Sequence, residues 1–484
     1  MPASLSRPRA VAFASLLVAA TGCGATAAPD PATETPAPAP TTPVAVPTPK
    51  APAPPLDHGS VSTTYPAFAP NIPQLTNKGG KVLANPVVVT ITWNDDPNVA
   101  AEEAVADTIG ASDYWRAVVG EYGVGAVTSG AANHVHLTTP LVLPTGPDAD
   151  PVPPILKVIT DALADPAASG WPAPTDQSVY LAYITGAAAK QLCDAGAGGL
   201  HDTVTVSGKE IPFAISAACA DPMSKFDALQ EATISASHEL AEVVVDPFPD
   251  SAPGWQGLGS DRLAWELLVM GQDENGDLCE LYDDVYGMHG APQLPFAVQR
   301  TWSNKSAAAG HAPCVPAPKD PNFNVTTLIA NDTVVANFAG ADAPPLDPTS
   351  LGYVIGVGQS RTIPLGFYSD GPTAPIAIEA FESDPFSQNG SSLDPSTDMN
   401  LELSLDKVSG QNGEKAYLTI KVVKDNAAKA HLVVVQATVG NVVRYLPILV
   451  GTAGKPATGR GGLKSAPTSS SASGRRASRG LGRR

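Results

Sequence analysis

The chain has 484 residues and a formal net charge of −18 at pH 7, and the segment after Gly454 contains eight Lys and Arg residues without any Asp or Glu. The rest of the chain therefore carries a net charge of −26. So acidic a body repels nucleic acid, which argues against specific nucleic-acid binding.

Residues 1–23 have the order of a bacterial export signal. Arg7 and Arg9 precede an apolar core, and Ala20-Thr21-Gly22-Cys23 ends it. Small residues before a cysteine are typical of a lipobox, which predicts lipidation at Cys23 and a membrane-anchored lipoprotein of the cell envelope. Alanine stands at the first lipobox position, where leucine is usual, so cleavage and secretion without a lipid is the alternative. No later apolar run is long enough to span a bilayer.

A linker rich in Pro, Ala and Thr is expected over residues 24–65, and a first folded domain over residues 66–316. The domain should be α+β, because β-branched runs alternate with helical periodicity. We expect strands at 86–93 and 178–184, helices at 100–122 and 155–163, and a short hairpin formed by residues 203–206 and 212–215.

The residue pattern of the segment 226–245 predicts that it forms the central helix of this domain. Its apolar residues have helical spacing, Asp221-Pro222 suits a helix start, and Asp246-Pro247 predicts a stop. His238 and Glu242 lie one turn apart on such a helix and could bind one metal ion, with Glu239 as a catalytic base. The His-Glu-x-x-His zinc peptidases place two metal ligands and a base on one helix in the same way, and here glutamate occupies the position of their second histidine. The alternative is a solvated helix face.

An acidic loop follows at 273–280, and Glu274 or Asp277 could provide a further metal ligand. The loop also resembles an oxygen-rich calcium loop, although the full EF-hand pattern is absent. The alternative is a solvated acidic turn.

Four cysteines follow Cys23, and an even number in an exported chain favours disulfides. Three pairings are possible. We expect the sequential one, which joins Cys193 to Cys219 and Cys279 to Cys314; free buried cysteines are the alternative.

Residues 322–452 carry short β-branched runs separated by turn residues, which predicts an all-β immunoglobulin-like sandwich. Residues 453–484 predict a disordered basic tail. The tail could contact anionic polysaccharide, lipid or nucleic acid, or have no partner.

Several blocks in a fixed order resemble the EXORDIUM, or phosphate-induced protein, family of extracellular plant proteins and their bacterial relatives. The blocks are Cys193 with Gly198-Gly199-Leu200-His201, then Ala218-Cys219-Ala220, Ala236-Ser237-His238-Glu239-Leu240-Ala241-Glu242 and Asp246-Pro247, and finally residues 274–280, 298–304 and Cys314. The resemblance covers roughly residues 80–316. It implies an extracellular protein of a family that is linked, in plants, to growth and cell-wall-related signalling and has no established reaction. It also places His238, Glu239, Glu242, Glu274 and Asp277 in the family motif.

Two main hypotheses of function follow. The first is an exported zincin-like metallohydrolase, most plausibly a peptidase, whose divalent ion is zinc rather than calcium, although a carboxylate-rich site also suits calcium or manganese. The second is a non-enzymatic cell-surface protein with a structural metal or acidic cluster, whose sandwich binds a protein, glycan or cell-wall ligand. A structural cluster without metal is a third possibility.

Overall fold

The computed structural model describes residues 55–142, 144, 150–194, 197–219, 225–269, 271–288, 294–337, 349–383, 393 and 395–456. Nearly all of them belong to one compact unit that begins at Asp57. The expected signal segment, the lipidation site Cys23 and most of the expected linker and tail lie outside the described residues. Within the described ranges, no helix is long and apolar enough to span a membrane.

The first part is built on a five-stranded sheet with the strand order β2-β1-β3-β5-β4. All neighbouring strands are parallel except β4 and β5, which pair antiparallel around a Ser207-Gly208 turn with positive φ at both residues. This pair is the expected hairpin, and its strands are longer than the sequence predicted. The strands are β1 Val87–Trp93, β2 His134–Leu137, β3 Ser178–Ile184, β4 Gly199–Val206 and β5 Lys209–Ala217.

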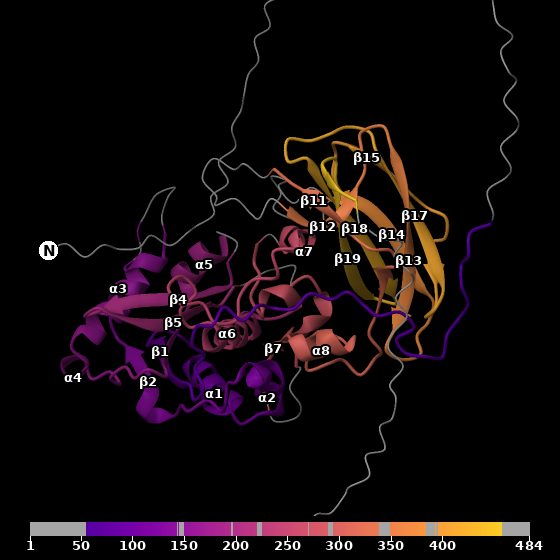
Figure 1. The fold of residues 1–484 in the computed structure, drawn as a ribbon. Coiled ribbons are helices and arrows are strands. Elements are labelled where there is room, and N and C mark those ends of the chain that lie inside the picture. The colour runs from indigo at the N-terminus through magenta and orange to yellow at the C-terminus, as the bar shows by residue number, and fades with distance from the viewer. Residues whose placement is uncertain are drawn as a thin grey trace, which may run out of the picture. The chain divides into compact units, whose positions relative to one another are not determined.

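Helices cover both faces of this sheet (Figure 1). Alternate residues of β3 face opposite ways: Leu181 packs with residues of α1, α2 and α6, whereas Tyr180 packs with residues of α3 and α5. Both faces are therefore buried, which explains why β3 carries apolar and aromatic side chains on both faces after Ser178. The helices are α1 Val99–Ile109, α2 Asp113–Val119, α3 Val152–Ala164, α4 Pro166–Ser169, α5 Gly186–Asp194, α6 Ala228–Val245, α7 Leu263–Leu268 and α8 Asn304–Ala309.

The helix expected at 100–122 is broken into α1 and α2, which corrects the prediction. Gly110 ends α1 where the chain passes close to Val127, whose backbone nitrogen would lie 2.3 Å from a Cβ at Gly110. Ser112 then starts α2, because its side chain accepts a hydrogen bond from Trp115 N. Short 3₁₀ turns are η1 Gly120–Tyr122, η2 Ala131–Asn133, η3 Asp277–Cys279 and η4 Asp283–Val285.

The described residues from 323 onwards form strands and contain no helix. A four-stranded sheet (β10-β13-β17-β15) and a seven-stranded sheet (β16-β14-β18-β19-β12-β11-β20) contribute to a common hydrophobic core. Their strands are β10 Phe323–Thr327, β11 Asp332–Val335, β12 Thr349–Val354, β13 Ser360–Ser369, β14 Ile376–Ser383, β15 Leu401–Leu405, β16 Ser409–Gly410, β17 Lys415–Val422, β18 Ala430–Val439, β19 Val442–Gly451 and β20 Gly454–Lys455. Two small ladders precede them, β6 Tyr286–Gly287 with β7 Val298–Gln299 and β8 Thr301–Trp302 with β9 Cys314–Val315.

Candidate metal centre

Helix α6 carries three of the predicted site residues, and local sequence fixes where it begins. Asp227 and Gln230 form a capping box, in which the Asp227 side chain accepts from Gln230 N and Gln230 Oε1 accepts from Asp227 N. The start expected at Asp221-Pro222 lies outside the described residues, and the first helical residue is Ala228. The helix ends at Val245, just before Asp246-Pro247, where the sequence predicted its stop.

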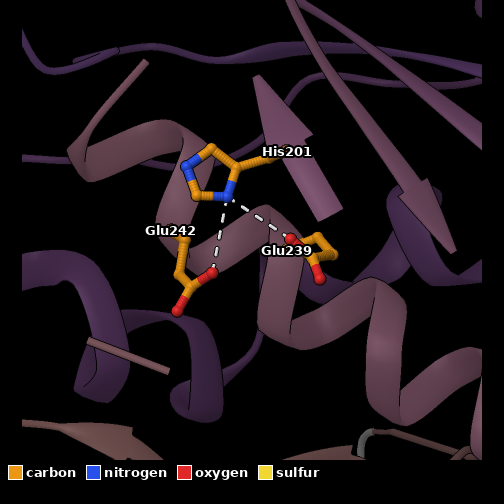
Figure 2. Close-up of side chains that lie close together, drawn as sticks. All are labelled: His201, Glu239 and Glu242. Carbon is orange, nitrogen blue, oxygen red and sulfur yellow. Dashed lines mark hydrogen bonds and ion pairs between the residues drawn. The ribbon is translucent and has the colours of Figure 1, made fainter. Parts of the chain in front are cut away.

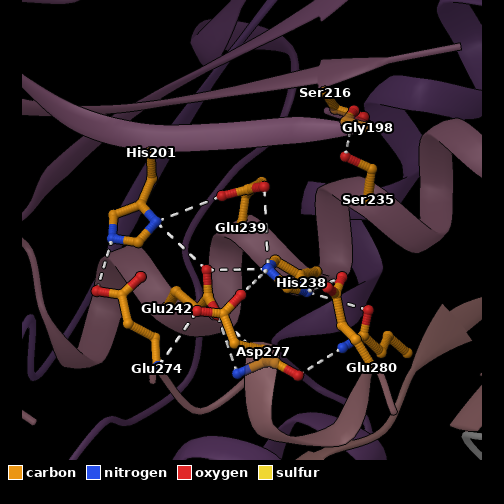
Figure 3. A network of polar contacts seen from close by, with 12 residues as sticks. Gly198, His201, Ser216, Ser235, His238, Glu239, Glu242, Glu274, Asp277 and Glu280 are labelled. Atoms are coloured by element: carbon orange, nitrogen blue, oxygen red, sulfur yellow. Dashed lines mark hydrogen bonds and ion pairs between the residues drawn. The ribbon is translucent and has the colours of Figure 1, made fainter. Parts of the chain in front are cut away.

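The face of α6 that bears the motif is buried rather than solvated, which contradicts the alternative reading of this helix. His238 is 7% exposed, Glu239 5% and Glu242 2%. Buried ionisable groups are costly unless they are paired or bind a metal. Figure 3 shows that these side chains face those of the segment 274–280.

Glu242 lies at the centre of the cluster. Its Oε1 accepts hydrogen bonds from the backbone nitrogens of Gly276, at 3.0 Å, and Asp277, at 3.2 Å. Its Oε2 lies 3.0 Å from His238 Nε2 and 3.4 Å from His201 Nδ1. Burial disfavours the charged form of Glu242, but the two imidazoles outweigh it and hold the pKa of this carboxyl well below its usual range.

The tautomer of His238 is fixed by Gln299. Gln299 Nε2 donates to the carbonyl oxygen of Gly276 at 2.8 Å, which orients the amide so that its Oε1 faces His238 Nδ1 at 3.0 Å. An amide oxygen only accepts, so the proton of a neutral imidazole stands on Nδ1. Nε2 therefore faces Glu242 Oε2 and Asp277 Oδ1, which is 3.5 Å away. Burial disfavours a charged ring, but Glu242 and the other nearby carboxylates outweigh it and hold the pKa of His238 well above its usual range, so a metal ion at Nε2 would displace a proton.

His201, on the edge strand β4, faces Glu239 and Glu242 of α6 (Figure 2). Its Nδ1 lies 3.3 Å from Glu239 Oε2, and its Nε2 lies 3.5 Å from Glu274 Oε1. His201 stands in one of the blocks that resemble the EXORDIUM family, but it was not predicted to be a site residue. The one feature of the neighbouring sequence that indicates a close approach of this strand to another element is the Gly198-Gly199 pair just before Leu200 and His201.

Two glycines let backbone approach the cluster closely. A Cβ on Gly276 would lie 2.6 Å from Glu242 Oε1 and 2.7 Å from His238 Nδ1. A Cβ on Gly199 would lie 2.5 Å from Glu239 Oε1 and 2.4 Å from Ser235 Oγ. Neither gap accepts a side chain, so the loop and the strand both close on α6 through glycine.

The predicted loop residues do not share one position. Asp277 lies beside His238, whereas Glu274 faces His201, so the structure brings Asp277, and not Glu274, to the His238–Glu242 pair. Their side chains are only 12% and 15% exposed, so the loop is not a solvated turn. Its Asp277–Cys279 stretch is a 3₁₀ turn. Burial, together with the Glu242 charge, raises the pKa of Asp277 well above its usual range.

Both expected disulfides are present. Cys193 is bonded to Cys219 and Cys279 to Cys314, with Cα–Cα distances of 5.7 and 5.8 Å. The second disulfide joins the residue two positions after Asp277 to strand β9, and therefore restrains the acidic loop. Disulfides indicate an extracellular or otherwise oxidising compartment.

Two groups of side chains within the described ranges could hold a metal ion. One consists of His238, Glu242 and Asp277, and the other of His201, Glu239 and Glu242. In each group, the possible ligand atoms all lie within 4.8 Å of one another. Each group combines one imidazole with two carboxylates, and imidazole suits zinc and other transition metals better than calcium.

Comparison with known proteins adds little to this description. No protein-family model matches the chain. None of the curated proteins matches it either. Among solved structures, a chimeric titin Z1Z2 carrying a decorin-derived peptide matches 27% of this chain and 91% of its own, at 14% identity and a TM-score of 0.15. A family 123 glycoside hydrolase from Clostridium perfringens matches 28% of each chain, at 10% identity and a TM-score of 0.17. At such TM-scores, neither similarity carries an argument about fold or function.

Proposed function

We propose that this chain is an exported metallohydrolase, with peptides as the substrate class. In this proposal His238, Glu242 and Asp277 hold a divalent ion, preferably zinc, and Glu239 serves as the base. The observation that carries it is the Gln299-fixed orientation of His238, whose Nε2 faces the buried carboxylate of Glu242 and the half-buried one of Asp277. Hydrogen bonding of the other ring nitrogen is the usual arrangement around a metal-binding histidine.

The residues present fit such an ion. The donors come from the helix and from a disulfide-restrained loop, and Gly276 leaves the space that the ligands need. When bound, the ion would act as a Lewis acid and would lower the pKa of a water molecule toward about 7.

Glu239 is the residue that we assign to proton transfer. Its Oε1 lies 4.0 Å from His238 Nε2, so the carboxylate borders the ion's position and does not belong to its ligand group. A carboxylate at that place can accept a proton from the attacking water and return it to the leaving group.

The zincin-like part of the proposal is supported by the motif's position on a helix that packs on a mixed sheet beside its edge strand. On sequence grounds we also propose a relationship with the EXORDIUM family over residues 80–316 and an immunoglobulin-like class for the β-rich part. A lipid on Cys23 would hold the protein at a membrane, where the β-rich part could bind a protein, glycan or cell-wall ligand.

The test is Glu239→Gln, measured with fluorescent casein and by elemental analysis of the purified protein. The variant should retain the ion bound through His238 and lose hydrolysis by about 10²–10⁴-fold. Glu210→Gln, on the exposed part of β5, is the matched control and should match the wild type. Wild-type protein that holds the ion and cleaves nothing, or a Glu239→Gln variant that cleaves normally, would contradict the proposal.

A further inference from the structure

The group of side chains around His201 supports a further inference, which rests on the proposed function. We propose that His201, Glu239 and Glu242 form a second divalent-cation position next to the first, and that Glu242 belongs to both. The protein would then contain a centre for two ions rather than one.

The distances around His201 suit this assignment. Its Nδ1 lies 3.3 Å from Glu239 Oε2 and 3.4 Å from Glu242 Oε2 (Figure 2). Two ligand atoms bound at zinc distances in tetrahedral geometry are about 3.3 Å apart. Both carboxylate oxygens therefore already lie at such a spacing from His201 Nδ1, and the possible ligand atoms of the three side chains all lie within 4.8 Å of one another.

His201 also has an unsatisfied polar atom inside the protein. Its side chain is 4% exposed, and its buried Nε2 has no hydrogen-bond partner among the described residues. The facing Glu274 Oε1 is also buried without a hydrogen bond, and it lies 3.5 Å from Nε2 as an ion-pair partner. If Nδ1 binds a cation, the proton of the ring is on Nε2 and can be donated to Glu274. This would explain why Glu274 faces His201 rather than His238.

Glu242 has one oxygen left for cations. The two backbone N–H groups occupy Oε1, and the two histidines approach Oε2 at 3.0 and 3.4 Å. An oxygen shared in this way would place the two ions about 3.5–4 Å apart, the usual spacing in two-metal sites.

The charge of the cluster supports two ions over one. Five carboxylates contact the two imidazoles, namely those of Glu239, Glu242, Glu274, Asp277 and Glu280. Glu280 is 41% exposed and can be solvated, whereas the side chains of the other four are at most 15% exposed. One divalent ion would offset two of the four charges that these buried carboxylates carry when ionised, and two ions would offset all four. Buried charge that is not offset is strongly destabilising.

The second ion would also orient Glu239. Its Oε2 would bind the cation with His201, and its Oε1 would remain directed toward the first position. The base of the proposed reaction would thus be held by the second ion.

The test is a calorimetric titration of the metal-free full-length chain with Zn²⁺, with the bound zinc checked by elemental analysis. Wild type should bind two equivalents. His201→Ala and His238→Ala should each bind one, whereas His311→Ala, on an exposed histidine after α8, should bind two. As a readout that needs no variant, two Mn²⁺ ions bound to the wild type should give the electron paramagnetic resonance spectrum of a spin-coupled pair.

The titration separates a failure of the second ion position from a failure of the proposed function. One equivalent in wild type, with the spectrum of an isolated Mn²⁺, would overturn the second position and leave the first intact. Two equivalents in His201→Ala, or none, would also overturn it, because His201 would then be either no ligand or a ligand of a single shared site. A wild type that binds no ion would refute the proposed function itself.

Discussion

The hydrogen bond between Gln299 and His238 is the contact on which the candidate site depends most at the scale of single residues. Gln299 is held at several points: its backbone nitrogen donates to Ser237 Oγ at 3.0 Å, and its carbonyl oxygen accepts from Tyr114 Oη at 2.5 Å. The amide therefore has little freedom to turn away from the imidazole.

Gln299→Ala should weaken zinc binding about 10–100-fold, the usual cost of losing an outer partner of a metal-binding histidine. The affinity of the metal-free protein for Zn²⁺ can be measured by competition with a chelating dye. Gln272→Ala, on an exposed residue before the acidic loop, is the control and should leave the affinity unchanged. Equal affinities of wild type and Gln299→Ala would show that His238 needs no such partner.

A second residue-scale feature is Glu102 of α1, which is fully buried away from the metal cluster. Burial, with the Asp96 carboxylate beside it, raises the pKa of Glu102 from 4.5 to about 9. The folded protein therefore keeps a proton that the unfolded chain loses above pH 4.5. By linkage, this group's contribution to stability is fully present below pH 4.5 and is lost as the pH rises toward 9.

Glu102→Gln should remove this dependence. The free energy of unfolding of the variant, relative to wild type, should rise with pH by up to about 1.4 kcal/mol per unit across that window. Urea unfolding at several pH values measures the difference, and Asp161→Asn, at a side chain that is 64% exposed, serves as control. A difference that stays constant with pH would mean that Glu102 titrates normally in the folded protein.

At the scale of elements, the site exists because α6 is enclosed between β4 and the acidic loop. Gly199 makes the contact with β4 possible, and Ser235 Oγ donates to the carbonyl oxygen of Gly198 at 2.8 Å. Any side chain at position 199 would push the strand that carries His201 away from Glu239.

The two neighbouring glycines provide a matched pair of variants. Gly199→Ala should lower the free energy of unfolding by roughly 1–3 kcal/mol, because the new methyl group overlaps Ser235, Glu239 and the backbone of Ile215. Gly198→Ala should change it little, since no atom lies within 4 Å of its Cβ position. Chemical denaturation measures both. Similar losses in the two variants would show that α6 and β4 are less tightly packed than the structure indicates.

Local sequence was enough to predict several elements, although not the break between α1 and α2, and it did not predict which elements pack together. Helix α6 follows from its apolar spacing and from Asp246-Pro247, and the β4–β5 hairpin from the runs at 203–206 and 212–215. His201 could not be selected in the same way, because its approach to Glu239 depends on how an edge strand packs against a helix 38 residues away. The roles of Glu274 and Asp277 could not be separated either, because both lie in one acidic loop. Only tertiary packing places Glu274 beside His201 and Asp277 beside His238.

At the scale of the whole molecule, the β-rich part contacts the segment that follows the acidic loop. Arg444 of β19 binds Asp284 through two hydrogen bonds of 2.8 and 3.0 Å and lies over the Tyr282 ring. Tyr445 stacks on the same ring, and one hydrophobic cluster includes Trp302 as well as Leu432 and Leu449. We infer that the β-rich part supports the loop that carries Asp277.

If the cluster holds an ion, ion binding must stabilise the folded chain as a whole. An ion that binds the folded state at about 100 times its Kd adds about 2.7 kcal/mol to the free energy of unfolding. Glu242→Gln is the sharpest comparison, because its amide oxygen can still accept from Gly276 and Asp277 while its NH₂ group replaces the oxygen that faces both histidines.

The most direct test is the melting temperature of the metal-free protein with and without saturating Zn²⁺. The wild type should melt about 3 °C or more higher with Zn²⁺, and Glu242→Gln should melt at the same temperature in both conditions. A wild-type melting temperature that Zn²⁺ leaves unchanged would contradict the assignment of His238, Glu242 and Asp277 as a metal site.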